Sequence, residues 1–224
     1  MIQEDLRKMA NPEKAKVLQR FFKTGKGEYG EGDVFLGVTV PQTREVAKKY
    51  KDVGLGEVKK LLDSRIHEER LAGLLILVEK YKKDRKRIYE FYLKNTKAIN
   101  NWDLVDLTSH EIVGDYLLDK DRRILYKLAR SKNLWERRIA IVATHRFIRN
   151  NMFDDTLRIS EILLDDEHDL IQKAVGWMLR EVGKRDRKTE EKFLKTHYKK
   201  MPRTMLRYAI EKFDEKKKNF YMER

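Results

Sequence analysis

The sequence contains no cysteine, only three prolines among 224 residues, and no apolar run long enough to cross a membrane. The lack of cysteine excludes disulfides, zinc ribbons, iron–sulfur clusters and thiol nucleophiles. Scarce proline and only 11 glycines leave few residues that break helices. The first residues are charged, which is not typical of a signal peptide. We therefore expect a helical, cytoplasmic protein without membrane spans.

Positive charge is in excess, because 51 Lys and Arg face 37 Asp and Glu, a formal net charge of +14. Such a surface attracts polyanions, so nucleic acid is the first candidate partner and an anionic membrane the second. An alternative is a highly charged surface without such a partner, as in heat-adapted proteins. Apolar residues make up 41% of the chain, enough to bury a core.

Amphipathic helices are predicted along most of the chain by apolar residues spaced three and four apart. The strongest segments are residues 66–81, 101–118, 134–149, 170–184 and 201–213, and two shorter ones are 122–131 and 156–166. The joints between them are short and polar. We expect one domain over residues 1–224.

The ends of the chain are less regular than residues 61–215. Residues 11–24 predict a helix with Pro12 in its first turn, 25–33 predict a loop, and 40–52 predict a second helix. Together they form a less regular N-terminal part over residues 1–60. Residues 216–224 are expected to form a basic tail.

A repeat with a period of about 34 residues links the regular segments. Its polar positions are Arg70, Asp106, Arg138, Gln172 and Arg207, and the residue two places after each is small: Ala72, Thr108, Ala140, Ala174 and Ala209. An alternative register puts Asp106 in the small column, where an unpaired carboxylate is costly, so we prefer the first. Two helices per repeat predict an all-α fold, an α-solenoid.

Stacked helices of a solenoid line a concave surface, and here that surface is predicted to be a basic groove. The residues expected to contact phosphate are Arg44, Arg70, Arg137, Lys173, Arg180 and Arg207. Asp106 is the exception, since a carboxylate there repels phosphate and needs another purpose or a partner.

Two motifs suggest chemistry that their context excludes. Gly25, Gly27 and Gly30 match G-x-G-x-x-G, but no strand precedes them and no helix opens after them, so a loop is the better interpretation. The segment HEERL at residues 67–71 begins like a zinc-protease motif but ends in Leu71 where histidine is required. We therefore expect no metal and no cofactor.

The three tryptophans divide between core and groove. Trp135 is assigned to the core at a helix start. Trp102 lies one helical turn before Asp106, and Trp177 lies one turn after Lys173, so both are predicted to face the groove. A buried core position remains the alternative for each of them.

Several spaced motifs resemble the AlkD-type DNA alkylation-repair glycosylases. They are NPEKA (11–15), FLGVTVP (35–41), NWDLVD (101–106), LWERRIAI (134–141) and IQKAVGWMLRE (171–181), and the similarity extends from about residue 11 to about residue 213. The resemblance implies a fold of HEAT-like helix pairs. This sequence departs from the family pattern in three places. Asn101 stands where the family often has an aromatic residue, Phe21 lacks the hydroxyl of the family's aromatic residue, and an extra glycine-rich stretch precedes residue 35.

The resemblance also implies a function, a monofunctional glycosylase that releases 3-methyladenine and 7-methylguanine from duplex DNA. The family's catalytic aspartate matches Asp106, its groove tryptophans match Trp102 and Trp177, and its groove arginine matches Arg138. The lesion is expected to be detected while its base stays stacked, by a monomer. We expect Asp106 to stay ionised near the start of its helix, with Asn101 as the cap.

Two other functions remain open. One is a nucleic-acid-binding helical repeat without catalysis, which Asp106→Asn would separate from the enzyme. The other is a protein scaffold, which predicts weak and salt-insensitive DNA binding, whereas a phosphate groove predicts a steep salt dependence.

Overall fold

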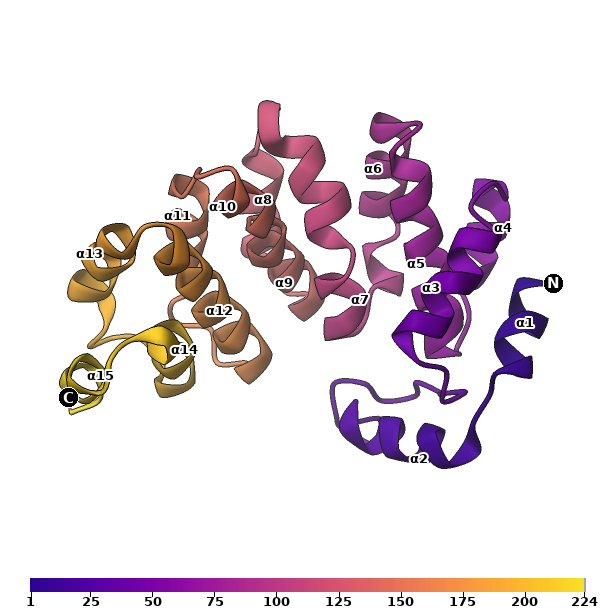
Figure 1. The fold of residues 1–224 in the computed structure, drawn as a ribbon, viewed down its shortest axis with the longest axis horizontal. Coiled ribbons are helices and arrows are strands. Elements are labelled where there is room, and N and C mark those ends of the chain that lie inside the picture. The colour runs from indigo at the N-terminus through magenta and orange to yellow at the C-terminus, as the bar shows by residue number, and fades with distance from the viewer. Residues whose placement is uncertain (224) are drawn as a thin grey trace. The chain divides into compact units, whose positions relative to one another are not determined.

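The computed structural model describes residues 1–223, which are helical over most of their length and contain no β-strand. An isolated bridge joins Val34 and Ile66. The chain divides into two compact units, Met1–Thr108 and the residues from Ser109 onward, called here the N-terminal and the C-terminal unit. The predicted all-helical fold is confirmed (Figure 1). Among residues 1–223, no helix has the length and apolar character needed to span a bilayer.

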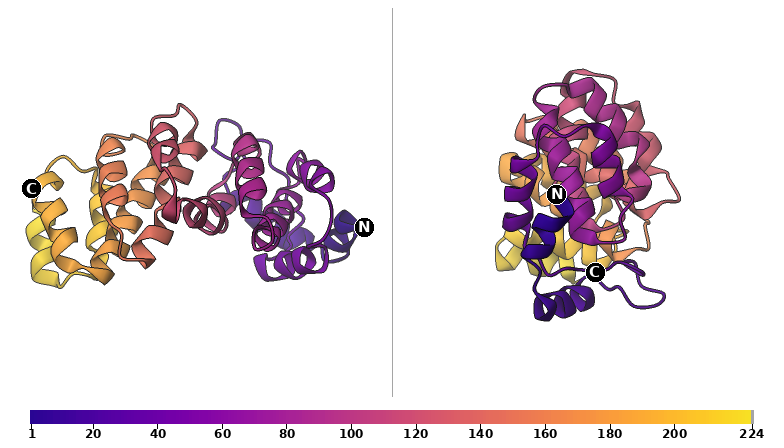
Figure 2. Two further views of the ribbon diagram at one scale, coloured as in Figure 1. Left: turned by 90° about the horizontal axis from the view of Figure 1, so that it is seen from above. Right: turned by 90° about the vertical axis from the view of Figure 1, so that its right-hand side faces the viewer.

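The N-terminal unit is built from short helices around the longer α5. Its helices are α1 (Ile2–Lys8), α2 (Pro12–Phe21), α3 (Val40–Lys49), α4 (Leu55–Leu62), α5 (His67–Tyr81), α6 (Arg85–Lys94), the 3-10 turn η1 (Thr96–Ala98) and α7 (Trp102–Asp106). Helices α3, α4 and α6 pack against α5, while α2 lies across the N-terminal ends of α3 and α5 (Figures 1 and 2).

Both proline-started helices form where the sequence predicts them. Pro12 opens α2, and the side chain of Asn11 accepts a hydrogen bond from the backbone N–H of Lys14. Thr39 and Gln42 form a capping box that starts α3. The predicted loop over residues 25–33 is also present. It folds on itself, since Glu28 accepts a bond from the N–H of Gly25 and Glu31 from that of Gly27.

The C-terminal unit has α12 at its centre. Its elements are the π-helix η2 (His110–Gly114), the 3-10 turn η3 (Leu117–Asp119), α8 (Arg123–Ala129), α9 (Leu134–Ala143), α10 (His145–Arg149), α11 (Asp154–Ile162), α12 (Asp169–Arg185), α13 (Arg187–His197), α14 (Arg203–Ala209), η4 (Ile210–Lys212) and α15 (Glu215–Met222). Helices α9, α11, α13 and α14 pack against α12 (Figure 2).

The predicted basic tail is a packed helix as far as the structure describes it. Helix α15 buries Tyr221, which is 3% exposed and contacts the rings of Phe213 and Tyr198 edge-on. Residue 224 lies outside the described residues.

Two predicted helices are interrupted. The segment 101–118 contains α7, a turn at residues 107–108, and then η2 and η3, because the Thr108 hydroxyl bonds to the Leu104 carbonyl and a π-helical turn follows. The segment 134–149 divides at Thr144, whose hydroxyl bonds to the carbonyl of Ile141. Such side-chain bonds to the backbone compete with the helical ladder.

The predicted column of small residues lies in the core. Ala72, Thr108, Ala140, Ala174 and Ala209 are each 0% exposed. Asp106 is half-exposed, which agrees with the register that keeps this carboxylate out of the packing column.

Candidate functional site

Helix α7 carries Trp102 and Asp106 on one face. The side chain of Asn101 accepts a hydrogen bond from the backbone N–H of Trp102, 2.8 Å away, which confirms the predicted cap. The indole of Trp102 stacks on Phe22 with ring centroids 5.0 Å apart, and Phe21 meets it edge-on at 5.9 Å. Trp102 and Asp106 are both half-exposed, so each presents part of its side chain to solvent.

The expectation that Asp106 lies near the start of its helix is wrong. Helix α7 has five residues and ends at Asp106, so the first-turn acid, next to the positive end of the helix dipole, is Asp103. Asp106 lies instead near Tyr92, where burial raises the pKa of the phenol and the charge of Asp106 adds to that rise. The Tyr92 hydroxyl lies 3.0 Å from the hydroxyl of Thr108.

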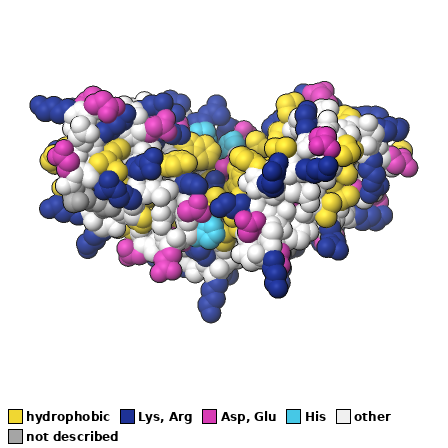
Figure 3. Space-filling model, turned by 90° about the horizontal axis from the view of Figure 1, so that it is seen from below, with side chains coloured by type: hydrophobic (Ala, Val, Ile, Leu, Met, Phe, Trp, Pro, Cys, Tyr) yellow, Lys and Arg dark blue, Asp and Glu magenta, His cyan; other side chains and the backbone are white. Residues whose placement is uncertain are grey.

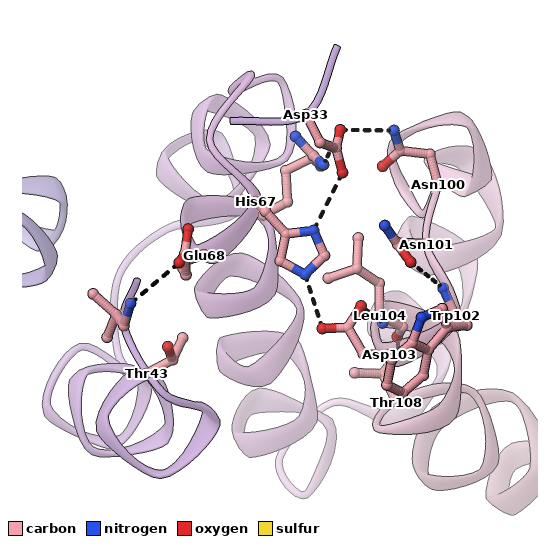
Figure 4. Close-up of polar contacts among 12 residues, drawn as sticks. Asp33, Thr43, His67, Glu68, Asn100, Asn101, Trp102, Asp103, Leu104 and Thr108 are labelled. Atoms are coloured by element: carbon pink, nitrogen blue, oxygen red, sulfur yellow. Dashed lines mark hydrogen bonds and ion pairs between the residues drawn. The ribbon is translucent and has the colours of Figure 1, made fainter. Parts of the chain in front are cut away.

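A buried ionic network fixes the start of α7 (Figure 4). The His67 imidazole lies between two carboxylates, with Nε2 2.8 Å from Asp103 and Nδ1 3.3 Å from Asp33. The three side chains come from α5, from α7 and from the loop before residue 34, and each is under 10% exposed. The second carboxylate oxygen of Asp103 accepts the N–H of Leu104.

The carboxylates keep His67 charged. Burial alone would lower the pKa of this imidazole, but the charge and hydrogen bond of Asp103, with the hydrogen bond of Asp33, outweigh it and raise the pKa to about 9. Burial also opposes ionisation of Asp33, yet the hydrogen bond from His67 and the charge of Arg70 lower the pKa of that carboxyl. His67 is therefore cationic and Asp33 anionic at neutral pH.

The segment HEERL, residues 67–71, builds this network. Glu68 accepts hydrogen bonds from the backbone N–H groups of Leu36, Gly37 and Val38, and so holds residues 36–38 against α5. Glu69 pairs with Arg7 at 3.1 Å. Four consecutive buried polar residues thus attach the N-terminal segments to α5. Within residues 1–223, no cluster of three or more His, Asp or Glu could hold a metal ion.

Arg70 belongs to the same network and not to an exposed surface, contrary to the sequence expectation. It is 4% exposed, pairs with Asp33 at 2.7 Å and donates a hydrogen bond to the carbonyl of Ser64. Arg137 and Gln172 likewise donate to the carbonyl six residues earlier in the chain. This shared bond makes Arg137, one residue before the predicted Arg138, the structural counterpart of Arg70.

The C-terminal unit holds the other two expected site residues. Trp177 on α12 is half-exposed, and its indole N–H donates to Glu181 at 3.1 Å. Its ring contacts His145, which in turn contacts His110 edge-on. Burial and the charge of His110 lower the pKa of His145. Trp135, in contrast, is buried as predicted, at 7% exposure.

Arg138 lies deeper than the sequence predicts. It is 5% exposed, and its guanidinium donates to the carbonyl of Leu170 at the start of α12. Only a small part of this residue is therefore open to a phosphate.

The remaining predicted phosphate contacts differ in their surroundings. Arg207 is exposed and Arg44 half-exposed. Arg137, Lys173 and Arg180 each pair with a carboxylate, Asp166, Asp169 and Glu211 in turn. On the face seen in Figure 3, Lys and Arg side chains are interspersed with Asp and Glu. At these three positions a phosphate would share the cation with a carboxylate that is already paired with it.

Comparisons with known proteins point to one family. The model of a family described as DNA alkylation repair enzyme matches residues 2–213. Among solved structures, the chain is similar to a predicted DNA alkylation repair enzyme from Enterococcus faecalis, with a TM-score of 0.73 and 17% identity over 92% of this chain and 98% of that one. At that identity the likeness shows the fold alone. No curated protein matches the sequence.

Proposed function

This chain belongs to the DNA alkylation repair enzyme family, and we propose that it is a DNA glycosylase acting on positively charged alkylpurines in duplex DNA. The expected substrates are 3-methyladenine and 7-methylguanine. The observation that carries the proposal is the anchored helix α7, which presents Trp102 and Asp106 one turn apart, both half-exposed.

The reaction does not need a strong general acid. Alkylation at N3 or N7 gives the purine a positive charge, which makes it a good leaving group. As the glycosidic bond breaks, positive charge develops on the sugar, and a fixed carboxylate beside it stabilises that transition state. In the proposal Asp106 supplies the carboxylate and positions the attacking water.

The aromatic and basic residues would hold the substrate. The face of Trp102 favours a cationic base or sugar beside it, and the stack on Phe22 fixes the orientation of that face. We assign Trp177 the same kind of contact from the C-terminal unit. Arg138 would hold a phosphate next to the lesion through its exposed part.

The reaction ends with an abasic site and a released base. The proposal gives no lysine the role of a Schiff-base nucleophile, so we expect no strand cleavage by a lyase step. It also includes no cofactor. We further propose that the protein acts as a monomer in the cytoplasm.

Base release from methylated duplex DNA tests the proposal. The wild-type protein and Asp106→Asn would be incubated with the DNA, and released bases identified by chromatography and mass spectrometry. We expect 3-methyladenine or 7-methylguanine from the wild type, and at least about a hundredfold slower release from the variant. Intact strands before alkali treatment would support the absence of a lyase step.

A second candidate function is DNA binding without catalysis, which the net charge of +14 favours. Its signature is salt-sensitive binding of DNA by both proteins, with no released base from either. That result would overturn the glycosylase proposal.

A further inference from the structure

The net positive charge of the N-terminal unit lies on α6 and the chain on either side of it. Residues 1–108 contain 23 Lys and Arg against 17 Asp and Glu, an excess of six positive charges. Residues 80–97 alone contain eight Lys and Arg against two carboxylates, Asp84 and Glu90, which is the same excess of six. The other residues of the unit therefore carry equal numbers of positive and negative charges.

Four of these cations are exposed and form no ion pair within residues 1–223. We call them the α6 surface: Lys86, Arg87, Lys94 and Lys97. Glu90 is the only carboxylate of α6. Arg137, Lys173 and Arg180, in contrast, already pair with carboxylates. A phosphate at the α6 surface would share none of these four cations with a carboxylate partner.

The cations of the α6 surface form a row along the solvent side of the helix. Arg87 and Lys94 are two helical turns apart, so they lie on one side of α6 and about 10 Å apart along its axis. Ile88 and Tyr92, on the opposite side, are buried at 2% and 0% exposure. The length of the row is about the axial rise of three base pairs, so a DNA backbone can follow it.

This row ends beside the start of α7. Lys97 lies in η1 and lines the same shallow cavity as Asn100, whose side chain donates a hydrogen bond to Asp33. Helices α6 and α7 both pack against α5 (Figure 1). The α6 surface therefore adjoins the helix that carries Trp102 and Asp106.

The side chains around these cations favour nucleic acid over a membrane. An anionic membrane holds a helix by burying its apolar face as well as by attracting its cations. No large apolar side chain is exposed in residues 80–97, all of which the structure describes. A phosphate backbone needs cations and no apolar face.

Lys86 and Arg87 do not stabilise the helix that carries them. They lie in the first turn of α6, where the positive end of the helix dipole disfavours cations. That turn contains no acidic residue, and Asp84 before it accepts the backbone N–H of Arg87. Residues that contradict a local preference often serve a function, and a phosphate would supply the counter-charge that the first turn lacks.

We propose that the α6 surface binds the phosphate backbone of the duplex DNA that flanks the segment held at α7. The inference rests on the proposed function, which makes duplex DNA the substrate. It adds phosphate contacts on a helix where the sequence repeat predicts none.

Paired lysine variants test the contact. Lys86→Gln with Lys94→Gln removes two charges of the α6 surface, whereas Lys59→Gln with Lys60→Gln removes two lysines of α4 that are paired with carboxylates. Fluorescence anisotropy over a salt series would measure the affinity for a long unmodified duplex. We expect the slope of log affinity against log salt to fall by about 2 in the α6 variant and to stay unchanged in the α4 variant. An unchanged urea midpoint in both would separate a lost contact from a lost fold.

A tethered cleavage reagent locates the bound DNA. The chain has no cysteine, so Lys94→Cys provides a single attachment point for an iron chelate that cuts the DNA backbone nearby. Lys60→Cys on α4 is the control. On a duplex with one abasic-site analogue, we expect cuts from Lys94→Cys close to the analogue and on one side of it, and none from Lys60→Cys.

Equal slopes in the two paired variants would overturn the proposal, and so would cuts unrelated to the position of the analogue. Tighter binding to phosphatidylserine vesicles than to DNA would overturn it too, since a membrane would then be the partner. Base release tests the proposed function separately. Release together with any of these results contradicts only the α6 surface, while the expected slope and cuts without release contradict only the glycosylase.

Discussion

The two units hold their central helices by different means. In the N-terminal unit, α5 begins with four buried polar residues, 67–70, whose partners come from α1, α7 and the segments between α2 and α3. In the C-terminal unit, α12 packs through apolar side chains and through the bare backbone at Gly176. A Cβ on Gly176 would lie 2.4 Å from the carbonyl oxygen of Met205, so α14 approaches the bare backbone of α12.

This difference indicates where the orientation of a helix is fixed by specific contacts. Apolar packing is non-directional, while hydrogen-bonded ion pairs fix both distance and direction. One of these contacts, from His67, reaches Asp103, which lies one residue after Trp102 and three before Asp106. The proposed catalytic carboxylate thus lies on a helix whose start is held by a directional contact.

The largest effect on stability is expected from removing His67, the cation that Asp33 and Asp103 share. His67→Ala leaves Asp33 and Asp103 without their imidazole partner, and breaking a buried ion pair costs about 3–5 kcal/mol. The free energy of unfolding from urea titration checks this. His145→Ala is the matched control, since this half-buried histidine contacts rings and should cost about 1 kcal/mol. Equal losses in the two variants would contradict the comparison.

The same histidine predicts a pH dependence. Because its pKa rises from an ordinary 6.5 to about 9 on folding, its contribution to stability is complete below pH 6.5 and is lost as the pH rises through 9. Wild type should therefore lose stability over this window more steeply than His67→Gln. Parallel pH profiles of the two proteins would show that His67 is not the charged centre.

A smaller loss of stability is expected from overpacking the contact between α12 and α14. Gly176→Ala forces α12 and α14 apart, and overpacking of this kind costs about 1–3 kcal/mol. Thermal unfolding followed by circular dichroism checks it. Gly56→Ala provides the control, because nothing lies within 4 Å of the added methyl group. A variant at Gly176 as stable as this control would mean that the close approach is not needed.

A gain in stability is expected at Glu190, a buried carboxyl without a strong cationic partner. Burial raises its pKa to about 8, and Arg187, 3.9 Å away, only partly opposes this. The folded state thus loses stability as the pH rises from about 4.5 to 8. Glu190→Gln should remove that loss and stabilise the protein by roughly 1–3 kcal/mol above pH 8. Urea titrations of the wild type and the variant at low and high pH measure this difference. A variant less stable than the wild type at high pH would contradict the prediction.

The smallest effect concerns single phosphate contacts. Arg207→Ala, at an exposed position, should reduce the slope of log affinity for DNA against log salt by about 1. Arg70 is buried in its ion pair, so Arg70→Met should change the free energy of unfolding and leave that slope unaltered. Fluorescence anisotropy over a salt series measures both slopes.

The sequence predicted the regular part of the fold well. Helices α5 and α12 and the small column at residues 72, 140, 174 and 209 follow from apolar spacing and period, which are local properties. The break after α7 could not be predicted, because it depends on Thr108 contacting Leu104 and Tyr92.

Sequence reasoning named site residues that lie partly at the surface, and it missed the buried contacts that support α7. Trp102, Asp106 and Trp177 are half-exposed, but the partnership of His67 with Asp33 and Asp103 joins residues 34 and 36 positions apart. The available signal was HEERL itself, four polar residues opening the apolar run of α5. As a metal motif it fails at Leu71, where histidine is required, and its true partners are too distant in sequence for the motif to reveal them.

The most direct test compares the two aspartates of α7. Single-turnover release of 7-methylguanine from methylated duplex DNA would be measured for Asp103→Asn and Asp106→Asn, together with DNA affinity and unfolding free energy. The account predicts that Asp106→Asn slows release at least about a hundredfold while binding and stability remain, whereas Asp103→Asn mainly lowers stability. Release by Asp106→Asn at the wild-type rate would contradict it.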